Sequence, residues 1–183
     1  MNTQPASAYF LETTKAPVES HTLSIVVDNE PGVLARVIGL FSGRGYNIES
    51  LTVSETEHES HVSRITIVTS GTAMVLEQIR AQLERLVPVH SVADLTVTGN
   101  AIERELALIK VAGVGEHRVE ALRLADAFRA RVVDATNNSF VFELTGKTRK
   151  VDQFIALMQP LGLTEVVRTG IAAISRGPKP VKV

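Results

Sequence analysis

The chain has 183 residues, of which 44% are apolar and only 4% aromatic, so it can form one large domain or two small ones with aliphatic cores. Its formal net charge of -1 gives no electrostatic attraction to nucleic acid or to an anionic membrane. The absence of cysteine excludes disulfides, thiolate metal sites, iron–sulfur clusters and thiol nucleophiles.

The first 20 residues, Met1 to Ser20, are polar and show no periodicity, so we expect a flexible tail there. They lack the basic start and the apolar block of a secretory signal. No apolar run in the chain approaches the roughly 20 residues that a membrane span needs. We therefore expect a cytoplasmic protein with no membrane partner.

From His21 onward the sequence alternates strand and helix patterns in the order βαββαβ. Leu23, Ile25 and Val27 recur at every second position, which is typical of a strand. Apolar residues then recur at helical spacing until Gly43-Arg44-Gly45 ends the helix. The expected elements are, in chain order, a strand at 21–27, a helix at 33–41, strands at 46–55 and 62–69, a helix at 75–86 and a strand at 89–98.

The same order returns after Gly99-Asn100, at an offset of roughly 80 residues, which indicates a duplicated domain. The expected elements are a strand at 106–111, a helix at 117–129, strands at 131–135 and 140–145, a helix at 151–158 and a strand at 163–169. In the first of these helices we expect four residues to face the core, namely Val119, Leu122, Ala125 and Phe128.

The predicted fold is α+β, with two ferredoxin-like βαββαβ domains in tandem. Each should be a four-stranded antiparallel sheet with both helices on one face. The expected bounds are a tail at 1–20, domains at 21–98 and 103–177, and a tail at 178–183. The other face of the first sheet carries Val26, Thr66 and Val68 and stays open unless something covers it. Because edge strands and open faces readily pair with a second copy, we expect a homodimer.

The turn Asp28-Asn29-Glu30-Pro31-Gly32, between the first strand and helix, is the most informative local feature. Pro31 suits a first helical turn, and Asp28 or Asn29 could cap it. The unpaired N–H groups of Gly32, Val33 and Leu34 would lie at the positive end of the helix dipole, where a carboxylate binds readily. The amide of Asn29 could accept from an ammonium, with Leu34 and Ile48 as an apolar wall. The alternative is a turn without a ligand, which the spacing alone favours.

Other chemistries have weaker support. His58 and His61, with Glu57 and Glu59, could form a metal site, but a solvated loop is the more common outcome. There is no Ser-His-Asp order and no glycine-rich phosphate loop. The strand at 62–69 lacks the aromatic residues that an RNA-recognition domain of this topology needs.

Three cations, Lys147, Arg149 and Lys150, are interpreted as a solvated helix face that could also contact a partner.

Several segments resemble one known family. The stretch from Val27 to Val37 resembles the first strand and helix of an ACT domain, a small-molecule sensor found on amino-acid enzymes. Further segments resemble the regulatory small subunit of acetolactate synthase (acetohydroxyacid synthase); they are Ile38-Gly39-Leu40-Phe41-Ser42, residues 44–53, Ser63-Arg64-Ile65-Thr66, Glu103-Arg104-Glu105-Leu106 and Ser175-Arg176-Gly177. The resemblance covers about residues 21–177 in one continuous order.

This resemblance implies a regulatory role without a catalytic site. In the family, a separate catalytic large subunit condenses two 2-oxo acids with thiamine diphosphate, Mg2+ and FAD, and so begins the synthesis of valine, leucine and isoleucine. The small subunit activates this partner and makes it sensitive to feedback inhibition, usually by valine. We therefore expect no cofactor or metal on this chain. Leucine or isoleucine remains an alternative effector.

The resemblance also implies a binding site shared between two chains. Valine sits between the N-terminal domains of a dimer, held by the turn and helix start of one chain and by the second strand of the other. The residues carried over are Asn29, Gly32, Val33 and Leu34 on one side and Asn47 and Ile48 on the other. The N-terminal tail before His21 is longer than in the short bacterial members of the family, and Pro31 stands at a position where serine also occurs.

Overall fold

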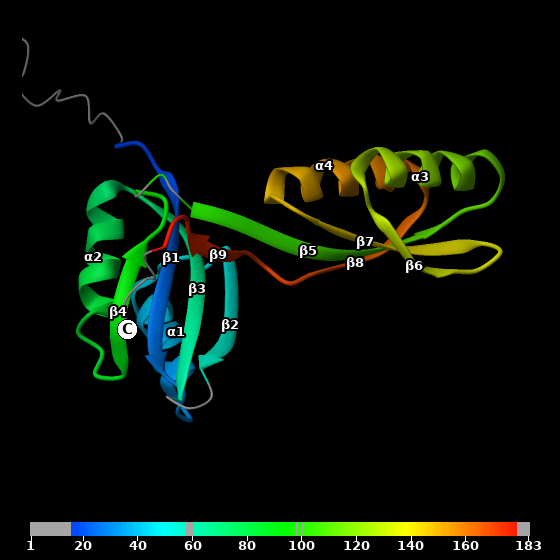
Figure 1. The fold of residues 1–183 in the computed structure, drawn as a ribbon. Coiled ribbons are helices and arrows are strands. Elements are labelled where there is room, and N and C mark those ends of the chain that lie inside the picture. The colour runs from blue at the N-terminus through cyan, green and yellow to red at the C-terminus, as the bar shows by residue number, and fades with distance from the viewer. Residues whose placement is uncertain (1–15, 58–60, 98, 100, 179–183) are drawn as a thin grey trace, which may run out of the picture.

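The computed structural model describes residues 16–57, 61–97, 99 and 101–178. They form two units, each a sheet with two α-helices on one face, and the second unit projects away from the first (Figure 1). The predicted pair of ferredoxin-like domains is confirmed. Within the described residues, no helix has the length and apolar character to cross a membrane.

The first unit contains the six predicted elements in the predicted order. They are β1 (Glu19–Asp28), α1 (Val33–Arg44), β2 (Ser50–Glu57), β3 (Val62–Gly71), α2 (Ala73–Leu83) and β4 (Val89–Asp94). The strands lie in the order β2-β3-β1-β4 and pair antiparallel throughout, so β2 and β4 are the edges. Strand β1 begins two residues before its predicted start, β2 begins four residues late, and β4 ends at Asp94 instead of continuing to residue 98.

The core of the first unit lies between its sheet and its helices. Every second residue of β1, namely Leu23, Ile25 and Val27, is buried there against Val37 and Phe41 of α1. This arrangement follows from the period of two in a strand and of 3.6 in a helix, which place both apolar sets on facing surfaces. This first core is mainly aliphatic, as the composition predicted, whereas the core of the second unit also contains Phe140, Phe142 and Phe154.

The second unit repeats the topology and adds a strand. Its elements are β5 (Ala101–Ala112), α3 (Gly115–Phe128), β6 (Arg131–Ala135), β7 (Ser139–Gly146), α4 (Thr148–Met158), the 3-10 helix η1 (Gln159–Leu161), β8 (Leu163–Arg168) and β9 (Ala172–Ser175). The main sheet has the order β6-β7-β5-β8, and β9 pairs with the start of β5. Strand β9 was not predicted, and β5 begins five residues before its predicted start.

The prediction for the inward face of α3 is wrong at two positions. Val119 and Leu122 are 51% and 39% exposed, whereas Ala121 and Ala125 are buried against the sheet. Apolar residues occur around much of this helix, so their spacing did not select one face. The small side chains of the two alanines let the helix approach the sheet closely, and Phe128 packs at the same interface as predicted.

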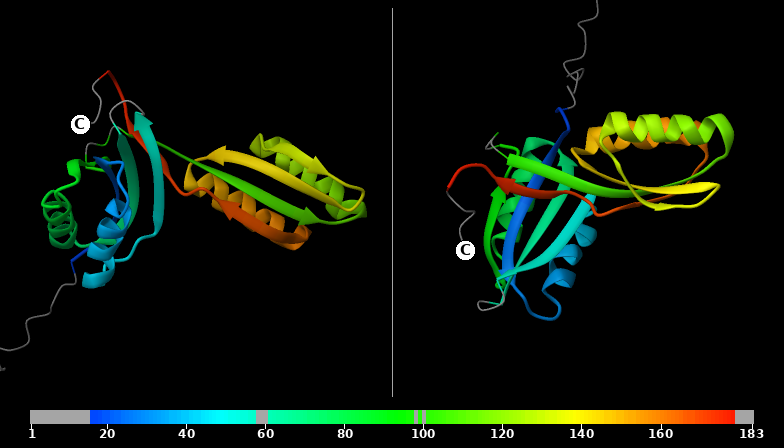
Figure 2. Two further views of the ribbon diagram at one scale, coloured as in Figure 1. Left: turned by 90° about the horizontal axis from the view of Figure 1, so that it is seen from below. Right: turned by 45° about the vertical axis from the view of Figure 1, so that its right-hand side comes forward.

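The second face of the first sheet, expected to be open, is covered by the chain itself. The start of β5 and β9 form a two-stranded ribbon that crosses this face, opposite the helices (Figure 2). Thr22 Oγ1 donates to Glu103 Oε1 across the contact at 2.7 Å. Val26, Thr66 and Val68 are consequently buried as well. Because this face is covered, a second copy would have to pair with the sheet through the edge strands.

Candidate effector-binding site

The turn between β1 and α1 leaves the start of the helix without a side-chain cap. Gly32 is the N-cap residue, in a left-handed conformation with φ 90°, and α1 has no acidic residue in its first turn. Neither Asp28 nor Asn29 caps the helix, contrary to one expectation; instead, Asp28 Oδ1 and His90 Nε2 lie 2.7 Å apart. The positive end of the helix dipole is therefore not neutralised by the turn.

Not all N–H groups of the predicted set are free. The N–H of Val33 donates to the Glu30 carbonyl at 3.3 Å, which is a long hydrogen bond. Among the described residues, no acceptor is bonded to the N–H of Gly32 or of Leu34. The side chain of Val33 is only 5% exposed and belongs to the core, whereas Asn29 is exposed and Leu34 is 37% exposed. The turn thus presents two N–H groups, one amide and one apolar side chain to solvent.

The second predicted group lies between the end of α1 and the start of β2. The carbonyl of Asn47 accepts from Thr69 Oγ1 at 2.6 Å, which fixes the backbone while the residue stays exposed. Ile48 is half-buried and packs against the core of the first unit. The next residue continues this anchoring, because the N–H of Glu49 donates to the Val68 carbonyl at 2.8 Å.

The strand register shows that these two groups lie at opposite ends of one sheet. Ser50, at the start of β2, pairs with Val68 of β3, which pairs in turn with Thr22 near the start of β1. Asp28, at the end of β1, pairs instead with Val62. Six residues of β1 therefore separate the two levels, a distance of about 20 Å at about 3.3 Å per residue. Within one chain, the turn and the segment Asn47–Ile48 do not form a common pocket.

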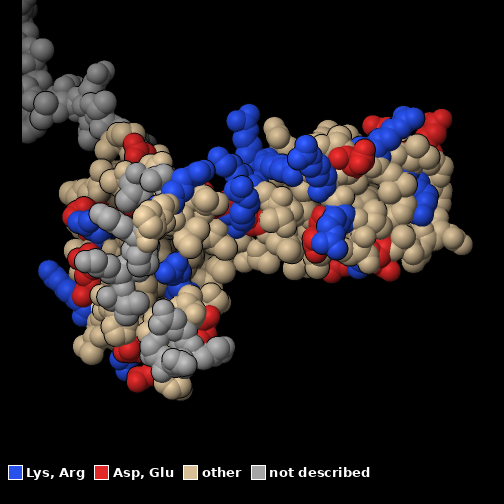
Figure 3. All heavy atoms as spheres, in the orientation of Figure 1, with Lys and Arg blue, Asp and Glu red and all other residues tan. Residues whose placement is uncertain are grey.

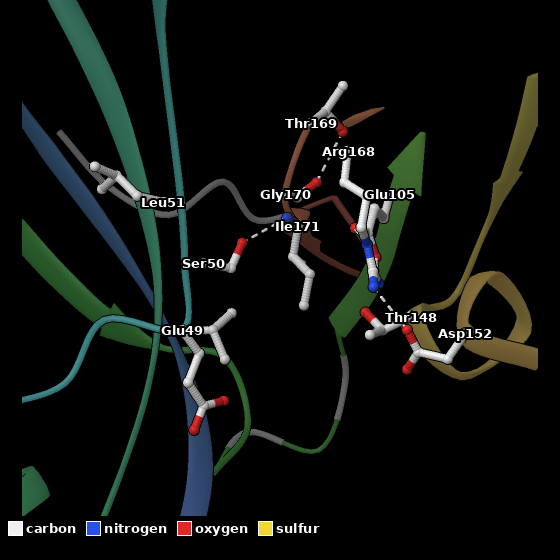
Figure 4. Close-up of a pocket in the computed structure, with 11 residues that line it drawn as sticks. Glu49, Ser50, Leu51, Glu105, Thr148, Asp152, Arg168, Thr169, Gly170 and Ile171 are labelled. Carbon is white, nitrogen blue, oxygen red and sulfur yellow. Dashed lines mark hydrogen bonds and ion pairs between the residues drawn. The ribbon is translucent and has the colours of Figure 1, made fainter. Parts of the chain in front are cut away.

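A cleft of about 500 Å³ adjoins the second group where the two units meet (Figure 4). The residues Glu49, Ser50 and Leu51 line one side of it. Opposite them, the segment between β8 and β9 is held by Ile171, whose N–H donates to Ser50 Oγ at 2.9 Å and whose carbonyl accepts from Thr52 Oγ1 at 3.0 Å. This cleft was not predicted, because it depends on segments about 120 residues apart.

An ion-pair cluster forms the other wall of this cleft. Arg168 binds both carboxylate oxygens of Glu105, one of them at 2.8 Å, and reaches Asp152 at 2.7 Å (Figure 4). Glu105 is only 4% exposed. The hydrogen bond to Glu105, and then the bond to Asp152, raise the pKa of Arg168 above its ordinary value despite its partial burial. The cluster joins β5, β8 and α4. Its charges are paired with one another, so the cluster serves to hold these three elements together.

The histidines do not form a metal site that the structure describes. Of the pair considered from the sequence, His58 lies outside the described residues, and His61 follows it in the connection between β2 and β3. Within the described part of the chain, no three His, Cys, Asp or Glu residues are grouped to hold a metal ion.

Comparison with known families decides the assignment. Residues 104–177 match the family described as "Small subunit of acetolactate synthase", and residues 23–91 match the "AHAS small subunit-like ACT domain". The chain belongs to the acetolactate synthase small-subunit family. Its N-terminal unit is thus an ACT domain, and the resemblance noted in the sequence is confirmed.

Relatives in this family match over nearly their whole length. The acetolactate synthase small subunit of Haemophilus influenzae is 49% identical over 158 residues, which cover 86% of this chain and 96% of the relative. The probable small subunit of Archaeoglobus fulgidus is 48% identical over 159 residues, covering 87% and 98%. A crystal structure of the small subunit from Thermotoga maritima superposes with a TM-score of 0.79 at 38% identity, covering 88% of this chain and 99% of that one.

Membership of this family gives the chain a regulatory role beside a catalytic acetolactate synthase subunit in branched-chain amino-acid synthesis. The comparisons place no residue in a ligand site.

Proposed function

We propose that this small subunit activates its catalytic partner and confers feedback inhibition by valine, which binds between the ACT domains of two copies. The observation that carries this proposal is the separation of about 20 Å between the β1–α1 turn and the Asn47–Ile48 segment in one chain. Two half-sites at opposite ends of a sheet suit a pocket completed by a second copy.

The edge strand β2 offers a way to bring the half-sites together. It has a partner on one side only, so its outer edge can pair with β2 of a second copy. In a two-fold arrangement the paired strands run antiparallel, and the start of one β2 lies level with the end of the other. The end of β2 is level with the β1–α1 turn of its own chain, since Glu57 and Asp28 both pair with Val62. This pairing therefore places Asn47 and Ile48 of one copy level with the turn of the other.

The groups at the two half-sites match the chemistry of a small aliphatic amino acid. The N–H groups of Gly32 and Leu34 suit its carboxylate, and the helix dipole adds to this attraction. The amide oxygens of Asn29 and Asn47 can accept from its ammonium. The side chains of Leu34 and Ile48 provide an apolar wall, which fits valine and leaves leucine and isoleucine as alternatives.

We assign the chemistry itself to the catalytic subunit, with thiamine diphosphate, Mg2+ and FAD bound there and no cofactor on this chain. The cytoplasm is the proposed location of the complex. Effector binding would fix the relative orientation of the two ACT domains. This orientation would in turn change how the dimer binds the catalytic subunit. Couplings of this kind are typically about 1–3 kcal/mol, or about 5- to 150-fold in affinity.

Calorimetry on the full chain with valine, leucine and isoleucine tests the effector, and assays of the catalytic subunit with and without the chain test activation. We expect saturable binding of valine, a rise in acetolactate synthesis on adding the chain, and loss of that rise when valine is present. Failure of all three amino acids to bind would overturn the effector assignment. Acetolactate formation by this chain alone, from pyruvate and thiamine diphosphate, would overturn the regulatory role.

A further inference from the structure

Four cations line a groove of about 430 Å³ beside the junction of the two units, which we call the basic groove. Arg104 comes from β5, Lys147 precedes α4, and Arg149 and Lys150 lie in the first turn of α4. Figure 3 shows Lys and Arg side chains gathered over this junction, with few Asp or Glu among them. Because the whole chain has a net charge of only -1, this concentration is local.

Among the described residues, these cations differ from many others in having no carboxylate partner. Elsewhere in the chain, ion pairs are formed by Lys110 with Glu165, by Arg168 with Glu105 and Asp152, and also by Arg80, Arg123 and Arg131. No ion pair within the described residues involves a cation of the basic groove. The guanidinium of Arg104 donates a hydrogen bond to the backbone carbonyl of Glu103 at 2.7 Å, which leaves its charge unpaired among the described residues.

The position of the cations on α4 is also unfavourable for the chain alone. They stand at the N-terminal, positive end of the helix dipole, where acidic residues stabilise a helix and basic residues destabilise it. The helix has no acidic residue in its first turn and no side-chain cap. Sequences tend to break such local rules where a function requires it. An incoming negative group would be attracted both by the cations and by the exposed N–H groups of this turn.

Contacts within the chain hold part of the basic groove in place. A Cβ at Gly146 would lie 2.8 Å from Cδ of Lys150, so the lysine stem runs over this glycine at the end of β7. Arg104 stands on a strand that is continuous between the two units. The groove is therefore formed jointly by the second unit and by the strand that connects it to the ACT domain.

We propose that the basic groove is the surface by which this small subunit docks on an acidic surface of the catalytic subunit. The proposal rests on the regulatory function given above, which requires such a partner. A protein surface fits better than a small anion, because three of the four cations, Arg104, Lys147 and Arg149, are exposed and Lys150 is only half-buried. A small anion needs buried, converging donors, whereas several carboxylates on a protein can each meet one cation.

The test is a charge reversal in the full chain, Lys147→Glu with Arg149→Glu, measured as association with the catalytic subunit by surface plasmon resonance. We expect about tenfold or more weaker binding at low ionic strength, mainly through slower association. The difference should shrink at about 1 M salt, where the screening length is only about 3 Å. The neutral variant Lys147→Gln with Arg149→Gln should show a smaller loss, and thermal unfolding of both variants checks that they fold.

The matched control is Arg85→Glu with Arg123→Glu, which changes the net charge equally at exposed positions outside the groove. If the control variant bound the catalytic subunit as weakly as the groove variant, net charge alone would account for the weaker binding, and the proposal would be overturned. Unchanged association of the groove variant at every salt concentration would also overturn it, as would saturable binding of inorganic phosphate that is lost in that variant. If the unsubstituted chain neither bound nor activated the catalytic subunit, the proposed function would fail instead. Valine binding should stay unchanged in every groove variant.

Discussion

The backbone N–H of Ile171 donates to Ser50 Oγ at 2.9 Å, and this contact joins the segment between β8 and β9 to the first residue of β2. Ser50 lies two residues after Ile48, at one end of the proposed effector pocket. Ile171 follows Gly170 and leads into the ribbon that covers the ACT sheet. The proposed pocket and the connection to the second unit therefore meet at one short stretch of chain, residues 47–50, which leads into β2.

Ser50→Ala should weaken the inhibition of the complex by valine without changing valine binding to the isolated small subunit. The substitution removes a hydrogen bond worth about 0.5–1.5 kcal/mol, which is comparable to an allosteric coupling of about 1–3 kcal/mol. Inhibition curves of the complex and calorimetry of the isolated chain check it. Ser54→Ala, on the same face of β2 but without a bond to Ile171, is the control. An equal effect of both variants would count against this contact.

Gly32→Asp should abolish the response to valine while activation of the catalytic subunit survives. A Cβ at Gly32 would meet no other atom within 4 Å, so the chain itself has room for the side chain. The added carboxylate would, however, stand where the carboxylate of valine is proposed to bind. Gly32→Ala separates the effects, because it brings only the strain of a left-handed residue, about 1–2 kcal/mol. Loss of activation with inhibition unchanged would contradict the assignment.

Asn29→Ala and Asn47→Ala should each weaken valine binding by about tenfold or more, because each removes a polar contact to a charged ligand worth about 1.5–3 kcal/mol. Both residues are exposed, so the free energy of unfolding should change by only about 0.5 kcal/mol or less. Calorimetry and denaturant unfolding measure the two quantities. Wild-type affinity in either variant would remove that residue from the proposed site.

His21 should make the stability of the ACT domain depend on pH. Its ring is buried, which lowers its pKa, but the hydrogen bond and charge of Asp94 at 2.6 Å, with Glu19 nearby, outweigh burial and raise the pKa above 6.5. The protonated ring therefore stabilises the fold below about pH 6.5, and this contribution is lost as the pH rises through the folded-state pKa.

Denaturant unfolding across this pH range, for the unsubstituted chain and for Asp94→Asn, measures the effect. The variant should lose much of the slope that the unsubstituted chain shows above pH 6.5. An identical pH dependence in the two proteins would show that the pair of His21 and Asp94 is not its source.

Local patterns were sufficient for most of the fold. The apolar core residues of β1 recur at every second position, and those of α4 recur at helical spacing. Each element therefore places an apolar face against the core, and both elements were predicted correctly. Strand β9 was missed because its four residues, Ala172 to Ser175, carry no alternation and acquire strand structure only by pairing with β5. Val119 of α3 was wrongly predicted to face the core, because apolar residues occur around much of this helix and their spacing does not single out one face.

The candidate site was less accessible to sequence reasoning. The unpaired N–H groups at the start of α1 could be anticipated from the turn, but the cap expected from Asp28 or Asn29 is absent, and Asp28 contacts His90 instead. The contribution of Asn47 came from the family resemblance alone. The contact of Ser50 with Ile171 joins residues 121 apart, and no local pattern predicts such a pair.

The most direct test of the shared pocket is to mix the chains carrying Asn29→Ala and Asn47→Ala. In a mixed dimer, one pocket combines the intact Asn29 of one chain with the intact Asn47 of the other, whereas the second pocket lacks both. If the pocket lies between two copies, each variant alone should bind valine weakly, and the mixture should regain wild-type affinity at about half the sites of its mixed dimers. No recovery in dimers shown by mass spectrometry to be mixed would contradict a pocket shared between chains.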